Sequence, residues 1–223
     1  MKNKLAYSSE IYLLKIDEIL KLENAGNYFG EDGVVILLGD NNKGIPDTLY
    51  SGRKVLDAAD KSKEKFVEAR IAYKDMSDFF AFFVNLIKPL KRKHYVVGSG
   101  IYWTMLKDVE NKNITRGMRN AQNAYQWSKG KAWSFSEAER KSRYDKLYNS
   151  LKEKGYDYNN PILVLLNRKF GVRDQVLQGH HRMGICREVG IEEVSIRFWA
   201  SPKSPDFMKL VDKFVSNLKR IKK

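Results

Sequence analysis

The stretch Gln178-Gly179-His180-His181-Arg182-Met183-Gly184 separates segments of different periodicity. Before it, residues 161–166 and 175–177 are typical of two short strands joined by a turn over residues 167–174. After it, residues 182–189 predict a short helix ended by a glycine at 190, and residues 193–199 alternate like a half-buried strand. The region therefore predicts the order strand, glycine turn, helix, strand.

This arrangement suits an anion. Gly179 lets the backbone approach a ligand closely, and the start of the following helix presents unpaired N–H groups with a partial positive charge. His180, His181 and Arg182 add side-chain donors at the same place. The pattern favours a phosphate site, although it also fits a solvated turn in which the histidines only cap the helix.

The wider order of elements resembles the ParB/sulfiredoxin superfamily over roughly residues 133–200. A helix over residues 142–154 ends at a glycine and precedes the proline-led strand, the turn, the second strand and the Gly-His-His-Arg motif. The matching sequence segments are Leu151-Lys-Glu-Lys-Gly155, Pro161-Ile162, Val176-Leu-Gln-Gly-His-His-Arg182, Glu188-Val-Gly190 and Val194-Ser-Ile196. The resemblance implies an α/β fold of mixed α+β type that binds nucleotides. Members of the superfamily include CTP-binding partition proteins, sulfiredoxin and free-serine kinases.

Two positions depart from that pattern. Many kinase-like and nuclease-like relatives carry an acid where this chain has Gln178, so no acid–base role is expected there. His180 occupies the slot of sulfiredoxin's nucleophilic cysteine, so neither sulfinic-acid repair nor a phosphohistidine is expected. The single cysteine, Cys186, is expected to pack as a small apolar residue.

The resemblance also implies the roles of individual residues. Arg143, Lys146 and Ser150 share one helix face, and carried over they would touch nucleotide phosphates opposite the motif; alternatively they form a solvated face. The candidate catalytic residues are His181, Arg182 and His180, and the candidate nucleotide-binding residues are Gly179, His180, His181, Arg182, Arg143, Lys146 and Ser150. We expect Arg182→Ala to abolish nucleotide binding and to leave the fold intact.

Composition narrows the class of protein. The chain has 223 residues, 43% of them hydrophobic and 30% charged, with one cysteine and three histidines. One cysteine cannot form an internal disulfide, and no metal-ligand spacing is present, so no metal site is predicted. The most apolar run, residues 79–87, is too short to span a bilayer, and a cytoplasmic location is expected.

The net charge of +14 is unevenly distributed. Residues 111–155 hold 11 Lys and Arg against 4 Asp and Glu, and residues 201–223 hold 7 against 2. Clusters of this kind favour a nucleic-acid partner, because neutralised phosphates release counterions. Lysine-rich solvated surfaces would give the same composition.

The rest of the chain divides into three predicted parts. Residues 1–110 form an N-terminal α/β segment that contains the first strand of the sheet plus an insertion, residues 111–200 the ParB/sulfiredoxin-like domain, and residues 201–223 a basic amphipathic helix. Within the first part we expect a strand passing into a helix over residues 10–22, a buried strand over 33–39, a surface turn over 40–46 and a helix over 57–90. Short strands are expected on either side of Gly98-Ser99-Gly100, and a basic helix over residues 113–130.

The sequence favours a protein that binds a nucleoside triphosphate, ATP or CTP with Mg²⁺, and acts on or with nucleic acid by hydrolysis or phosphoryl transfer. Three alternatives stay open: a kinase for a small metabolite or modified base, a non-catalytic DNA-binding or interaction protein, and a ParB-like nuclease.

Overall fold

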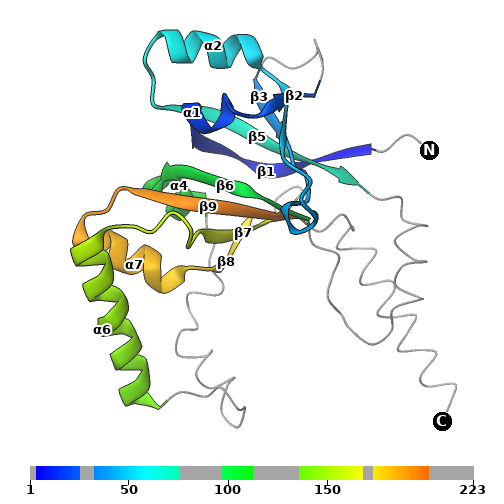
Figure 1. The fold of residues 1–223 in the computed structure, drawn as a ribbon. Coiled ribbons are helices and arrows are strands. Elements are labelled where there is room, and N and C mark those ends of the chain that lie inside the picture. The colour runs from blue at the N-terminus through cyan, green and yellow to red at the C-terminus, as the bar shows by residue number, and fades with distance from the viewer. Residues whose placement is uncertain (1–3, 26–32, 76–96, 113–135, 168–172, 201–223) are drawn as a thin grey trace, which may run out of the picture.

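The computed structural model describes residues 4–25, 33–75, 97–112, 136–167 and 173–200. These form one nine-stranded mixed sheet with the strand order β2-β4-β3-β5-β1-β6-β9-β7-β8 (Figure 1). The strands are β1 (Lys4–Lys15), β2 (Glu23–Asn24), β3 (Val34–Leu37), β4 (Thr48–Ser51), β5 (Phe66–Asp75), β6 (Val97–Met105), β7 (Ile162–Leu166), β8 (Gln175–Gln178) and β9 (Glu193–Ala200). The helices are α1 (Ile16–Ile19), α2 (Arg53–Lys61), α4 (Leu106–Lys112), α6 (Glu137–Lys154) and α7 (His180–Val189), with a 3₁₀ turn η1 (Asn41–Lys43). None of these described helices is long and apolar enough to cross a membrane.

The sheet has two halves that meet at a narrow joint. In the first half, β5 pairs antiparallel with β1 and parallel with β3. In the second half, β9 pairs antiparallel with β6 and parallel with β7. The halves meet where β1 and β6 share the residue pair Leu14 and Thr104. Strand β6, from the predicted segment 1–110, therefore lies in the same half-sheet as residues 162–200.

A common core packs across the joint. Phe198 of β9 is fully buried, with its ring centroid 4.7 Å from that of Tyr12 in β1 and 6.3 Å from that of Tyr102 in β6. Burial of each such side chain contributes roughly 1.5–3 kcal/mol to folding. The joint is therefore held by side-chain packing more than by backbone pairing.

A buried carboxyl group also ties the two halves together. Asp174, 1% exposed, accepts hydrogen bonds from the Ser9 Oγ (2.8 Å), the Tyr12 hydroxyl and the Asn167 backbone N–H (2.6 Å). Burial raises the pKa of Asp174, and the three donors oppose that rise. This carboxyl connects β1 to both ends of the turn between β7 and β8.

The element order predicted around Gly179 is confirmed. Strand β7 alternates buried and half-buried side chains, and α7 buries Met183, Ile185 and Cys186 against the core. The helix ends at Gly190, whose φ of 78° is left-handed. The chain is thus a mixed α/β protein.

Helix α6 begins earlier than the expected residue 142, at a capping box. The Ser136 Oγ accepts from the Glu139 N–H, and the Glu139 carboxylate accepts from the Ser136 N–H. The helix ends at Gly155 and projects from the sheet beside α7 (Figure 1). Its Tyr144 hydroxyl donates to Glu188 Oε2 of α7 at 3.1 Å.

Two predictions for the N-terminal segment are wrong. The helix expected from residue 57 ends at Lys61, and β5 follows it, because Val67, Ala69, Ile71 and Tyr73 alternate as the buried face of a central strand. The strands expected on either side of Gly98-Ser99-Gly100 are one strand, β6, with a register shift against β9 between residues 98 and 101. The helices expected over residues 76–90, 113–130 and 201–223 lie outside the described residues.

Candidate functional site

The first turn of α7 is shaped by Gly179. This residue is the N-cap of the helix and has a φ of 110°, a conformation that side chains rarely adopt. A Cβ at this position would lie 3.1 Å from Cγ1 of Ile162, so β7 approaches closely here. Because glycine has no side-chain oxygen, the cap residue leaves the first N–H groups of α7 available to a ligand.

His180 and His181 differ in their surroundings. His180 is half-buried, and its Nδ1 is buried with no hydrogen-bond partner among the described residues. Burial lowers the pKa of His180, His181 lowers it further, and a hydrogen bond to the Val176 backbone acts in the opposite direction. The His180 ring is therefore neutral near pH 7. His181 is exposed at the helix start.

Arg182 has a partner that the sequence did not predict. Its Nη1 donates to the backbone oxygens of Asn160 at 2.6 Å and of Pro161 at 3.2 Å. The Tyr156 hydroxyl donates to the same Asn160 oxygen at 3.0 Å. Arg182 thus fastens the loop between α6 and β7, and its guanidinium carries further N–H donors on Nε and Nη2.

The three α6 candidates are not all near the first turn of α7. Arg143, Lys146 and Ser150 are exposed, as the solvated-face interpretation expects. Arg143 is next to Tyr144, whose hydroxyl contacts Glu188 in the last turn of α7. Eight residues of helix rise separate Glu188 from His180, about 12 Å. Arg143 therefore lies near the opposite end of α7 from His181.

Carboxylates do not gather around the motif in the described part of the chain. Gln178, where the resemblance to the ParB/sulfiredoxin superfamily would lead one to expect an acid, is exposed. Asp174, at the other end of β8, has its carboxyl buried among Ser9, Tyr12 and Asn167. Among the described residues no group of three or more His, Cys, Asp or Glu side chains is placed to hold a metal ion.

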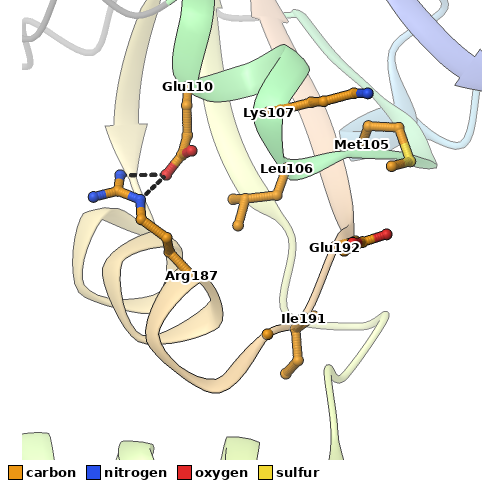
Figure 2. A pocket seen from close by; sticks show the side chains of 8 residues that line it. Met105, Leu106, Lys107, Glu110, Arg187, Ile191 and Glu192 are labelled. Carbon is orange, nitrogen blue, oxygen red and sulfur yellow. Dashed lines mark hydrogen bonds and ion pairs between the residues drawn. The ribbon is translucent and has the colours of Figure 1, made fainter.

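A cavity of about 310 Å³ lies at the other end of α7 (Figure 2). It is bounded by α4, by the last turn of α7 and by the entry to β9, and the Arg187 side chain binds the Glu110 carboxylate beside it. Its lining residues are Met105, Leu106, Lys107, Glu110, Arg187, Gly190, Ile191 and Glu192. Sequence reasoning missed this cavity, because its walls come from segments about 80 residues apart with no shared motif.

Searches with this chain against protein-family models, curated proteins and solved structures found no match. The likeness to the ParB/sulfiredoxin superfamily therefore depends on the motif and on the order of elements quoted above, and it stays a prediction.

Proposed function

We propose that the protein binds the phosphates of a nucleoside triphosphate, ATP or CTP, at the first turn of α7 and acts together with nucleic acid. The observation that carries the proposal is the start of α7, where a strand leads through a left-handed glycine into a helix whose first residues are His180, His181 and Arg182. Such a helix start combines unpaired N–H groups with the positive end of the helix dipole.

Each residue of this turn has a separate role in the proposal. The backbone N–H groups of residues 180–182 donate to phosphate oxygens. His181 is exposed and adds a side-chain donor, whereas the neutral His180 orients the turn through its contact with Val176. Arg182 supplies positive charge while it holds the loop at Asn160 and Pro161 against the helix.

The described residues support binding further than they support catalysis. Mg²⁺ prefers carboxylate and phosphate oxygens, and residues 179–183 at the first turn of α7 include no carboxylate. Among the described residues no group of three or more His, Cys, Asp or Glu side chains could hold the ion there. In the proposal the ion arrives with the triphosphate.

The nucleic-acid part of the proposal depends on charge. Within residues 111–155, the described part is mainly α6, where Lys141, Arg143, Lys146, Lys152 and Lys154 are all exposed, interspersed with the exposed acids Glu139, Asp145 and Glu153. The helix extends about 27 Å and projects from the sheet, which presents these cations to a long polyanion (Figure 1). Phosphate contacts of this kind bind with little sequence preference and weaken as salt rises.

A thermal-shift screen of the full chain with ATP, CTP and GTP, each with Mg²⁺, tests the nucleotide part. We expect ATP or CTP to raise the melting temperature in proportion to occupancy. His181→Ala should remove most of the shift, whereas Arg187→Ala, which removes a cation from the last turn of the same helix, should keep it. If the two variants lose the shift equally, the first turn of α7 is not the site.

The alternatives give different results in the same preparation. A small-metabolite or modified-base kinase would consume ATP and form a phosphorylated product without DNA. A non-catalytic DNA-binding protein would bind DNA and show no nucleotide shift. A nuclease would shorten labelled DNA in the presence of a divalent metal ion.

A further inference from the structure

A second cavity, of about 240 Å³, lies at the joint between the two halves of the sheet. One wall comes from α1 and from the turn that contains η1, and the other comes from β6 and from the loop between α6 and β7. Its polar lining residues are Glu18, Lys21, Asn41, Asp47, Tyr102 and Tyr158. Ligand sites occur preferentially between structural units, and a ligand here would contact both halves at once.

Asp47 gives this cavity a fixed wall. The residue is 3% exposed, and its carboxylate accepts hydrogen bonds from the N–H of Gly39 (2.9 Å), the N–H of Gly100 (2.8 Å) and the Tyr102 hydroxyl. A Cβ at Gly100 would lie 3.3 Å from Asp47 Oδ2, which is tighter than most real contacts. Because its partners already surround it, Asp47 holds the η1 turn against β6 and leaves ligand binding to other groups.

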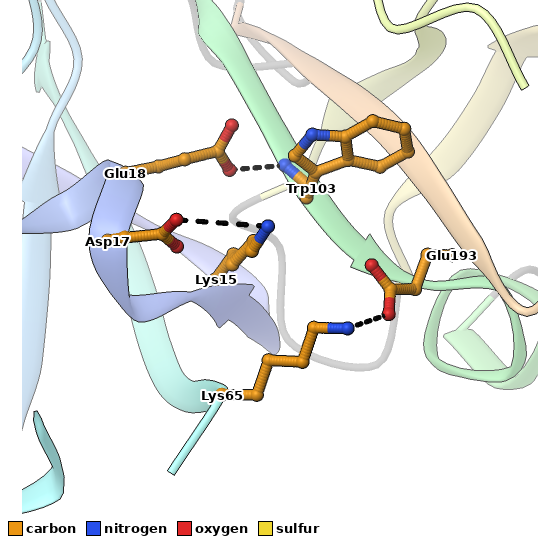
Figure 3. Close-up of polar contacts among 6 residues, drawn as sticks. All are labelled: Lys15, Asp17, Glu18, Lys65, Trp103 and Glu193. Carbon is orange, nitrogen blue, oxygen red and sulfur yellow. Dashed lines mark hydrogen bonds and ion pairs between the residues drawn. The ribbon is translucent and has the colours of Figure 1, made fainter. Parts of the chain in front are cut away.

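Glu18 is the carboxylate that a ligand can reach. It extends from α1 to β6, where its Oε2 accepts from the Trp103 backbone N–H (Figure 3). Nearby Lys15 points to Asp17, with Nζ and Oδ2 3.8 Å apart, and Lys65 binds Glu193. Neither lysine is therefore the direct partner of Glu18.

The Tyr158 hydroxyl cannot fully satisfy Glu18. It donates its proton to the Ile101 backbone oxygen at 2.6 Å, and it also lies within hydrogen-bond range of Glu18. One phenol proton serves one acceptor at a time. Burial raises the pKa of Glu18, as expected for a carboxyl group that has lost more hydration than it has regained from donors.

We propose that this cavity binds a small organic cation, an ammonium or guanidinium group on a short apolar body, with Glu18 as its counter-ion. The half-buried Tyr158 lines the same space, and aromatic rings attract cations. Lys21, at the edge, is exposed and can extend its charge into solvent. The volume limits the ligand to a body smaller than most drug-sized molecules.

Propylamine and methylguanidine are suitable probes, with propionate and 1-propanol as the anionic and neutral controls. In a titration of the full chain followed by NMR, the cations should shift the backbone amide signals of Gly100 and Trp103. The two control molecules should leave both signals in place. Cations that shift neither amide would overturn the proposal, whatever the variants show.

Glu18→Gln tests the counter-ion and keeps an oxygen for the Trp103 N–H. We expect it to weaken cation binding at least about tenfold. Glu193→Gln removes a carboxylate outside the cavity, and Lys21→Gln removes the cation at its edge, so both should bind as well as the parent or better. Equal binding by Glu18→Gln and the parent would refute the proposal. Loss of binding in Lys21→Gln, together with a response to propionate, would show an anion site instead.

Discussion

Arg182→Ala removes a contact whose effect on stability can be estimated. The Arg182 Nη1 donates to Asn160 O at 2.6 Å and to Pro161 O at 3.2 Å, and these bonds hold the loop between α6 and β7. Sequence reasoning expected this variant to lose nucleotide binding and to leave the fold intact. To that prediction the structure adds a loss of stability, because an alanine at position 182 makes no hydrogen bond to the loop.

A hydrogen bond from a charged donor contributes about 1.5–3 kcal/mol when buried. Arg182 is half-buried, Asn160 is an exposed residue and the hydrogen bond to Pro161 is long, so both bonds together should contribute about 1–2 kcal/mol. For a chain of this length that loss lowers the melting temperature by about 2–8 °C. Arg182→Lys keeps the charge but cannot reproduce the fork geometry, so it should fall between alanine and the parent.

The assay is thermal and urea unfolding of the parent and three variants. Arg187→Ala is the matched control, since it removes an exposed pair with Glu110 that contributes less than about 1 kcal/mol. If Arg182→Ala unfolds at the same temperature and urea concentration as the parent, the loop contact contributes nothing and this reasoning is refuted. A folded variant with unchanged triphosphate affinity would in addition remove Arg182 from the phosphate site.

Three further predictions concern other parts of the chain. Gly179→Ala should lower the free energy of unfolding by about 1–3 kcal/mol, because the residue has a left-handed φ and an added Cβ would contact Ile162. An added Cβ at Gly184 would meet no atom within 4 Å, so Gly184→Ala should raise the free energy of unfolding by up to about 1 kcal/mol. Equal effects of the two variants in urea unfolding would contradict this. Burial raises the pKa of Glu18, so the native state holds that proton more tightly, and this contribution to stability is present at low pH and lost as pH rises through the folded-state pKa. Glu18→Gln should therefore gain stability over the parent as pH rises from the ordinary range of a glutamate through the higher folded-state pKa, and a pH-independent difference in melting temperature would disprove this. DNA binding, measured by fluorescence anisotropy, should weaken steeply as the salt concentration rises. A variant in which four tail cations are changed together to glutamine should lose affinity less steeply with salt. An unchanged affinity and salt dependence in this variant would remove the tail from the DNA site. The four residues are Lys219, Arg220, Lys222 and Lys223.

The local signals of the sequence predicted the C-terminal half of the fold. Glycines at 179 and 190 marked the two ends of α7, and the glycine at 155 marked the end of α6. The turn over residues 40–46 is also confirmed, with η1 and a bridge between Asp40 and Ile45. These features depend on residues within a few positions of one another, which is why they could be predicted.

The errors have two different causes. The buried side chains of β5 alternate from Val67 to Tyr73, which is the period of a strand. The alanines and charged residues among them were interpreted as a helix instead. The joint between the half-sheets was not predictable. Asp47 meets Gly100 across 53 positions of sequence, and Glu18 meets Trp103 across 85. No local pattern reports contacts of that range.

The sequence predicted where the helix of the candidate site begins, but it did not predict which residues its side chains contact. The sequence located the first turn of α7, yet Arg182 also binds the loop at Asn160, and Arg143 lies toward the far end of α7. Both facts depend on how α6 and its loop pack on α7. The resemblance to the ParB/sulfiredoxin superfamily assigned roles to these residues from a sequence motif, and a motif contains no information about that packing.

Amide chemical shifts of the full chain during titration with MgATP and MgCTP test the central claim most directly. If the first turn of α7 holds the phosphates, one of these nucleotides will produce its largest saturable shifts at the backbone N–H groups of His180, His181 and Arg182. Saturable shifts that are largest elsewhere, for example at Leu106 and Ile191 around the cavity at the other end of α7, would contradict it. So would the absence of any saturable shift with either nucleotide.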